Sequence, residues 1–179
     1  MAKVDQVVKM KREELRRNIL KYEEYIKEHR LNVIRAYSVF LARINTYPVS
    51  KIEMLQRTFK HDYSKWDKEE FNAYRQYFYP TSFEKPDVDK FNWAWERHYT
   101  WNDHHPEFWY KDDKTASEMS NAAMLEMISD WLAMSMKFHN NPYDWFHNAL
   151  DSGEIILHPN TIEKVETILS HSSIKKSKF

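Results

Sequence analysis

The chain has 179 residues, and 27 Lys and Arg balance 27 Asp and Glu, so its formal net charge is zero. This balance argues against a dedicated nucleic-acid binder or a protein of anionic membranes, because both classes need surplus positive charge. The chain has no cysteine, which excludes disulfides and thiolate metal sites. Any metal ion would therefore be held by His, Asp or Glu, which suit hard or borderline divalent ions.

No secretion signal or membrane span is predicted. Residues 1–17 are charged throughout and lack the apolar region of a signal peptide. No apolar run approaches the roughly 20 residues that cross a bilayer. We expect a cytoplasmic protein without membrane association, in a bacterium or a phage-infected host cell. The sequence leaves open whether it forms a homo-oligomer.

The low glycine content favours an all-α fold. The chain has one glycine, whereas sheet proteins use glycine in hairpin turns and bulges. From about Glu13 to Ile44, apolar residues recur at spacings of three, four or seven, which indicates one long helix or two. Pro48 follows this pattern and marks its end, because proline cannot continue a helix interior.

Capping residues mark the helices that follow. Ser50 and Glu53 read as a capping box that opens a helix ending near residue 60. Asn141 and Pro142 suit another helix start, and Gly153 suits its end. Further helices are expected at residues 67–78, 88–101, 117 or 120 to 138, 142–152 and 159–169, with a loop at 102–116 and a flexible tail at 170–179. The sequence thus predicts one domain over residues 1–179, a bundle of about six to eight helices with its core at about 25–169.

The His61-Asp62 pair is the first candidate for chemistry. By itself the dipeptide has an ordinary explanation, a histidine at a helix C-terminus followed by a capping or surface aspartate. Lys65 lies one turn later, so its ammonium can point at the same space. A cation beside a metal suits a phosphate ligand, because both neutralise its oxygens. The alternative is an exposed lysine.

Asp130 lies within the most apolar predicted helix, beside Ile128 and Trp131. A carboxylate in a buried stretch is costly unless it is paired or bound to a metal. Asp130 shares a helix face with Glu126 at i, i+4, where two carboxylates repel each other. We therefore expect a metal ion or an Arg or Lys partner near them. A hydrogen-bonded core aspartate is the alternative.

His29 lies on the core-facing stripe of the first predicted helix, between Ile26 and Val33. A histidine on such a face is either a metal ligand or a hydrogen-bonded core residue. A second histidine-rich stretch comprises His98, His104 and His105, which together could serve a second metal. The alternative there is a polar loop with surface histidines, and we expect that two adjacent side chains do not both point inward.

Together these residues resemble the HD superfamily of metal-dependent phosphohydrolases, and within it an uncharacterised bacterial and phage group. The signature of that superfamily is a His on one helix, a His-Asp pair at the end of a later helix, and a distal Asp on a core helix. Here those positions are His29, His61-Asp62 and Asp130. Their separations are similar to those of compact HD nucleotidases. The resemblance is carried by residues 61–66, 95–105, 126–131 and 157–159.

The resemblance implies a helical bundle with one or two divalent ions, of Mn, Co, Fe, Zn or Mg. The first ion would be held by His29, His61, Asp62 and Asp130, and His98 with His104 or His105 would complete a second site. The implied reaction is hydrolysis of a small phosphoester, such as a nucleotide, by a metal-activated water. Asp62 and Lys65 would have catalytic roles, and Lys65, Arg97 and Trp101 would bind the substrate.

Two other classes of protein compete with a phosphohydrolase. One is an HD-type di-iron oxygenase, in which His98, His104 and His105 would supply further iron ligands. The other is a non-catalytic HD-fold protein that binds a nucleotide or a partner. For Trp101 the alternative to stacking on a nucleobase is packing in the core.

Overall fold

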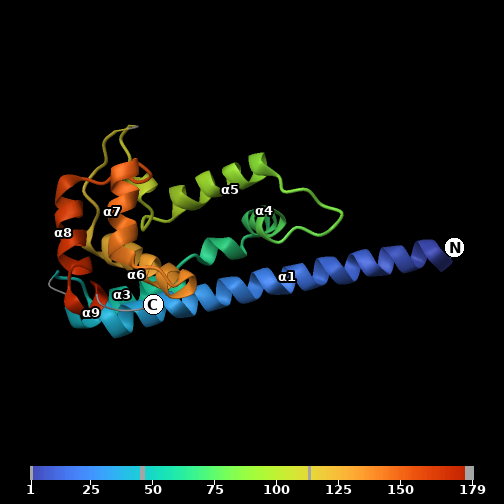
Figure 1. Ribbon diagram of the computed structural model, residues 1–179, viewed down its shortest axis with the longest axis horizontal. Coiled ribbons are helices and arrows are strands. Elements are labelled where there is room, and N and C mark those ends of the chain that lie inside the picture. Colours follow the sequence, from blue (N-terminus) through green and yellow to red (C-terminus); the bar gives the residue numbers. More distant parts are fainter. Residues whose placement is uncertain (1, 45–46, 113, 176–179) are drawn as a thin grey trace. The chain divides into compact units, whose positions relative to one another are not determined.

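A computed structural model describes residues 2–44, 47–112 and 114–175 of the chain (Figure 1). The all-α prediction is confirmed: these residues form helices and no strand, and their one isolated β-bridge joins Tyr110 to Ala116. In the same ranges, no helix combines the length and apolar character that crossing a membrane requires.

The chain divides into two compact units, each with an apolar core of its own. The first unit comprises residues 1–28 and 63–98, and the second comprises residues 29–62 and 99–179. The expectation of a single domain stays a prediction, and each unit is described by itself below.

The first predicted helix begins earlier than expected. Helix α1 spans Ala2–Ala36 rather than starting near Glu13, and it continues as a π-helical turn, Tyr37–Leu41, and then as α2, Ala42–Ile44. Val4 and Val7 in the added turns are exposed, so no core packing marks them in the apolar pattern. The added residues include neither glycine nor proline, and helix propensity therefore lets the helix extend past its packed part.

Six further helices lie close to their predicted positions: α3 (Lys51–Lys60), α4 (Lys68–Phe78), α5 (Val88–Trp101), α6 (Asn121–Phe138), α7 (Pro142–Ser152) and α8 (Pro159–Leu169). The 3₁₀ turns η2 (Tyr63–Trp66) and η3 (Pro106–Trp109) and the short helix α9 (Ser172–Lys175) were not predicted. The predicted loop at 102–116 therefore contains one short 3₁₀ turn.

Most of the predicted capping interactions form. The side chain of Ser120 accepts from the Ala123 amide at 3.1 Å, and Asn141 caps α7 in the same way. Gly153 ends α7 with a φ of 73°, a left-handed conformation that glycine adopts without steric cost. The predicted capping box of α3 is wrong in one respect, because Ser50 occupies the N-cap position without a side-chain hydrogen bond.

The expectation of a flexible tail from residue 170 is wrong for residues 170–175. Residues 172–175 form α9, and Ile174 is fully buried in the core of the second unit. Because the tail is mostly polar, its composition did not predict that this one side chain would be buried. Residues 176–179 lie outside the described part of the chain.

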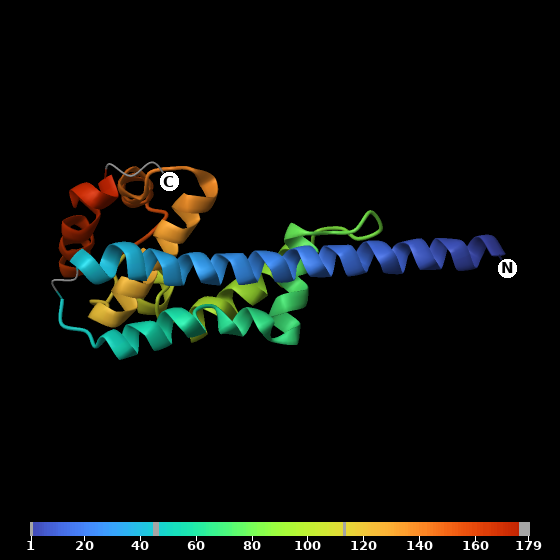
Figure 2. The ribbon, with the colours of Figure 1, turned by 90° about the horizontal axis from the view of Figure 1, so that it is seen from below.

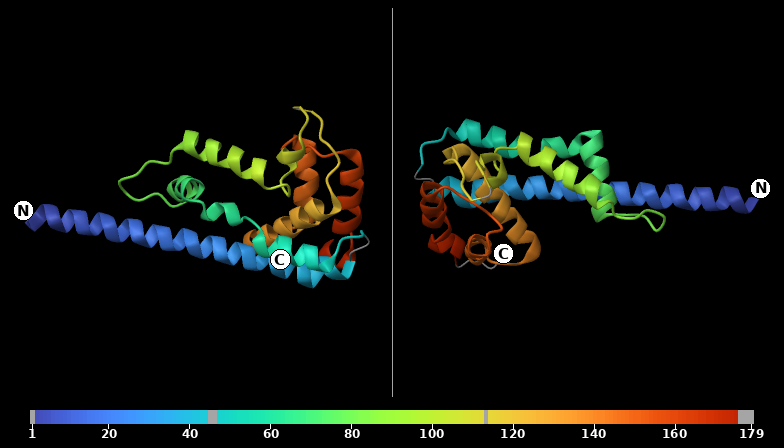
Figure 3. Two further views of the ribbon diagram at one scale, coloured as in Figure 1. Left: turned by 180° about the vertical axis from the view of Figure 1, so that it is seen from behind. Right: turned by 90° about the horizontal axis from the view of Figure 1, so that it is seen from above.

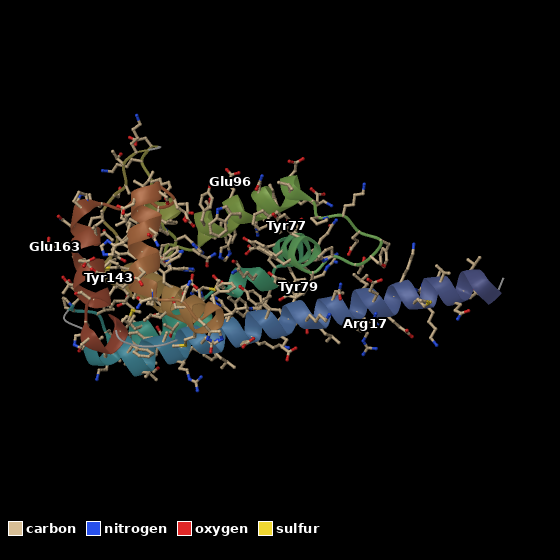
Figure 4. All side chains as sticks on the ribbon, viewed as in Figure 1. Arg17, Tyr77, Tyr79, Glu96, Tyr143 and Glu163 are labelled. Carbon is tan, nitrogen blue, oxygen red and sulfur yellow. The ribbon has the colours of Figure 1, made fainter. Side chains whose placement is uncertain are left out.

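In the first unit, α4 lies between α1 and α5 (Figure 1). Tyr22 and Ile26 of α1 form a buried cluster with Tyr74 of α4 and Ala94 of α5. Figure 4 shows the Arg17 side chain pointing to the side of α1 that faces away from α4 and α5. The first unit is thus held together largely by aromatic contacts across α4.

In the second unit, α6 is the central helix. It contacts α3, α7 and α8, and Figures 2 and 3 show these helices around it. Most of its side chains are buried, which is typical of a helix covered on several sides. Glu126 and Asp130 therefore lie on the most enclosed helix of the unit.

An ion pair anchors the loop between α4 and α5. The Arg75 guanidinium of α4 is 5% exposed and donates to both carboxylate oxygens of Glu84, at 2.5 and 2.8 Å. The Thr81 amide donates to the same carboxylate at 3.0 Å. Chiefly through the Arg75 hydrogen bonds, against the opposing effect of burial, the pKa of Glu84 falls to about 2.

We expect Glu84→Gln to lower the free energy of unfolding by about 1–3 kcal/mol at neutral pH, because the buried guanidinium loses its charged partner. The folded pKa of Glu84 lies below its unfolded value, so its contribution is present above that unfolded value and is lost as pH falls towards 2. Urea unfolding of both proteins between pH 7 and 3 measures the difference. Glu163→Gln, at an exposed position, is the control; an unchanged difference down to pH 3 would contradict the prediction.

Candidate metal centre

The second unit brings together the four residues predicted to hold the first metal ion. His29 lies on α1, and His61 and Asp62 directly follow the last residue of α3. Asp130 lies on α6. Three elements that are distant in sequence thus contribute to one cluster.

Most distances within the cluster are compatible with ligands around a cation. His29 Nε2 lies 3.2 Å from His61 Nε2 and 3.1 Å from Asp130 Oδ1. Asp62 Oδ2 lies 3.6 Å from each of the two Nε2 atoms. Bonds of about 2.0–2.2 Å to a metal place adjacent ligand atoms about 2.8–3.6 Å apart. The pair His61 Nε2 and Asp130 Oδ1 is slightly wider, at 3.8 Å.

The cluster is buried, which makes its charges costly unless they are compensated. His61 and Asp62 are each 1% exposed. Burial by itself would raise the pKa of Asp130, but the hydrogen bond from His29 and the electrostatic effect of the nearby His29 and His61 side chains outweigh it and lower that pKa. Asp130 therefore remains a carboxylate and an acceptor, as a metal ligand must be.

The backbone at Asp62 explains how two consecutive side chains reach one cluster. Its φ is 54°, in the left-handed region, where aspartate is among the few tolerated residues apart from glycine. His61, just before it, ends α3 with a φ of −46° and a ψ of 130°. This sharp change of direction turns both side chains inward, and nothing in the sequence pattern predicts it.

Glu126 supports the cluster from α6. Its Oε1 lies 3.0 Å from His61 Nδ1, and its Oε2 lies 2.8 Å from Nε of Arg57. Burial would raise the pKa of Glu126, but the hydrogen bond from His61 and the electrostatic effect of the nearby His104, His61 and Arg57 side chains lower it. Of the two expected partners of the Glu126–Asp130 face, a metal ion or an Arg or Lys side chain, the structure shows an arginine at Glu126. Sequence reasoning missed Arg57 itself, because only the tertiary fold brings it to Glu126.

A second set of potential ligands adjoins the first. His104 is 2% exposed, and its Nε2 lies 3.4 Å from Asp62 Oδ1. His105 also offers a ligand atom within 4.8 Å of atoms of His104 and Asp62. The expectation that these adjacent histidines do not both point inward is therefore wrong. His105 has an extended backbone at the start of η3, and its ring centroid lies 4.2 Å from that of His104.

Three of the remaining predicted site residues belong to the first unit. Buried His98 has its Nδ1 2.6 Å from Oε1 of Glu70. Lys65 Nζ lies 5.7 Å from the centroid of the Tyr74 ring, and Arg97 forms an ion pair with an aspartate of the same unit. A role for His98 with a metal, or for Lys65 and Arg97 with phosphate, stays a prediction.

A hollow opens beside the cluster in the second unit. It has a volume of about 320 Å³, and its lining includes Arg57, Lys60, Trp101, His104 and Glu126. Trp101 is 68% exposed, so the alternative that it packs in the core is wrong. The hollow thus lies at the edge of the buried cluster and is lined by two cationic side chains and an exposed aromatic ring.

The fold and the cluster define a class of protein: an all-α chain with buried histidines and carboxylates placed so that they could hold a metal ion. The chain belongs to a family of unknown function, DUF5662, which matches residues 18–171. No curated protein and no solved structure matches the chain. The family match covers every residue of the cluster and leaves its chemistry open.

We expect Arg57→Met to lower the free energy of unfolding by about 1–3 kcal/mol, because the substitution leaves the buried Glu126 carboxylate without its cation. Chemical denaturation of the metal-free chain measures this loss. Arg17→Met, at an exposed position of α1, removes the same charge elsewhere and should change stability by less than about 0.5 kcal/mol. Equal losses in the two variants would show that the Glu126 contact contributes no stability.

Proposed function

We propose that the chain is an HD-type metal-dependent phosphohydrolase that acts on a nucleotide or another small phosphoester. The observation that carries the proposal is the approach of two imidazoles, with the Nε2 atoms of His29 and His61 3.2 Å apart beside two carboxylates. Nitrogen and oxygen donors in this proportion suit Mn, Co, Fe, Zn or Mg. The resemblance to HD proteins supplies the reaction class.

His29, His61, Asp62 and Asp130 would hold the ion. When bound, it lowers the pKa of a water towards neutrality and polarises a phosphoryl oxygen. Lys60 and Arg57 supply positive charge at the hollow, where a phosphoester would enter. These two residues would orient the phosphoester and neutralise part of its negative charge. The exposed Trp101 ring offers an apolar face to the rest of the substrate.

The size of the hollow supports a small substrate. Its volume of about 320 Å³ lies at the lower end of the roughly 300–1,000 Å³ typical of small-molecule sites. Carboxylates and cations both line it, so a bound phosphate would need the cations and the metal together to offset those carboxylates. A small phosphoester fits this hollow better than a polymer does.

We expect the metal-stripped chain to gain thermal stability when Mn, Co or Zn is added. At a metal concentration about 100-fold above Kd the gain is about 2.7 kcal/mol, or about 5–10 °C in Tm for a chain of this size. Differential scanning fluorimetry measures the shift. His61→Asn should abolish it, whereas His147→Asn, at a 43% exposed side chain, should retain it. An equal shift in both variants would mean that the metal binds elsewhere.

We expect the wild-type chain to release phosphate from at least one member of a panel of nucleotides and simple phosphoesters in the presence of Mn or Co. Asp62→Asn should lose about 100-fold or more in kcat, because it removes a charged ligand while asparagine still tolerates the left-handed backbone. Asp151→Asn, at an exposed position of α7, is the control. Phosphate release by Asp62→Asn at the wild-type rate would rule the proposal out.

An iron-dependent oxygenase is the second candidate, favoured by the second ligand set at Asp62, His104 and His105. Two ions sharing one carboxylate are an arrangement that both chemistries use. Iron content of the purified chain and oxygen uptake with an organic substrate would distinguish it from a hydrolase. Tight nucleotide binding without turnover would instead indicate a non-catalytic binding protein.

A further inference from the structure

We infer that Glu126 is a positioning residue that holds His61 and His104 in one tautomer, with both Nε2 atoms directed at the carboxylate of Asp62. The inference rests on the metal centre of the proposed function and adds a residue that the HD signature does not contain. It concerns the imidazoles themselves and is testable without metal.

One oxygen of Glu126 faces both imidazoles. Glu126 Oε1 lies 3.0 Å from Nδ1 of His61 and 3.4 Å from Nδ1 of His104. An ionised carboxylate only accepts hydrogen bonds, so the proton must lie on Nδ1 of the histidine that donates. The 3.0 Å contact is a hydrogen bond. The 3.4 Å approach is longer than a usual hydrogen bond, but an anionic oxygen there still favours a proton on the ring nitrogen that faces it.

A ring protonated only on Nδ1 keeps its Nε2 lone pair, which can bind a metal ion but cannot hydrogen-bond to a carboxylate. His61 Nε2 lies 3.6 Å from Asp62 Oδ2, and His104 Nε2 lies 3.4 Å from Asp62 Oδ1. The two imidazoles thus approach opposite oxygens of one carboxylate. Their ring centroids are 4.4 Å apart, which is close enough for a single acceptor to reach both.

Arg57 fixes the orientation of Glu126. Its Nε lies 2.8 Å from Glu126 Oε2, which leaves Oε1 for the histidines. Arg57 also pairs with Asp103, the residue before His104. The same guanidinium therefore steadies the carboxylate and the loop that carries the second imidazole.

Other roles for Glu126 fit the contacts less well. A carboxylate that only balanced the charge of Arg57 would not need to approach two ring nitrogens of the same type. A carboxylate orienting a histidine whose other nitrogen binds a metal is a recurrent arrangement, and losing it typically weakens metal binding about 10–100-fold. Here one carboxylate would do this for two histidines.

The first test is ¹⁵N NMR of the imidazoles in the metal-free chain at about pH 8.5, above the usual pKa of histidine. We expect the wild type to show the proton on Nδ1 in both His61 and His104, and Glu126→Gln to show mixed tautomers. The matched control is Glu166→Gln, which removes a carboxylate 2.9 Å from Nε2 of surface His147 and should leave both rings unchanged.

The second test is titration with Co(II). Glu126→Gln should bind at least 10-fold more weakly than the wild type, and Glu166→Gln should bind within about twofold of it. Circular dichroism confirms that the variants fold. Unchanged affinity in Glu126→Gln, or unchanged tautomers, overturns the inference.

If Glu126→Gln does not fold, the wild-type spectrum alone still tests the inference. A proton on Nε2 of either His61 or His104 overturns it. The two proposals can also fail separately. Expected tautomers in a wild-type chain that binds no Co(II) would overturn the proposed metal-dependent function and leave the positioning role of Glu126 standing.

Discussion

Three carboxylates converge on the ring of His61, and the rest of the second unit is arranged to make that possible. Glu126 lies 3.0 Å from its Nδ1, while Asp62 and Asp130 lie 3.6 and 3.8 Å from its Nε2. Negative charges this close and this buried repel each other strongly unless positive charge lies among them. The chain supplies part of that charge through Arg57, and a divalent cation would supply more.

A few local features of the helices bring these carboxylates close to His61. Helix α6 presents Glu126 and Asp130 one turn apart, on the same face. The end of α3 and the left-handed backbone of Asp62 turn two consecutive side chains inward. Because α6 is covered by α3, α7 and α8, the two carboxylates of α6 are enclosed by a packed core that limits their movement. The cluster is therefore built mainly on helices and their ends, which favours precise ligand positions.

The sequence predicted the helices well because apolar periodicity and capping residues are local signals. It predicted His29, His61, Asp62 and Asp130 as one set only through the order and spacing of a known signature, and the structure brings these four together. Arg57 carried no signal of its own, since its partners lie in other elements and surface arginines are common. The buried Ile174 and the inward-facing His105 were missed for a related reason: each depends on tertiary packing that overrides a polar local sequence.

The two carboxylates of α6 are distinguished by their partners. Glu126 could itself belong to a metal site, because its atoms and those of His61 and His104 lie within 4.8 Å of one another. A cation there would have to share the Glu126 carboxylate with Arg57, whose guanidinium already occupies Oε2 at 2.8 Å. Asp130 has no such competitor among its contacts, which are with His29 and His61. A metal ion is therefore better accommodated on the Asp130 side of His61, and Glu126 is better suited to orient the ring from behind.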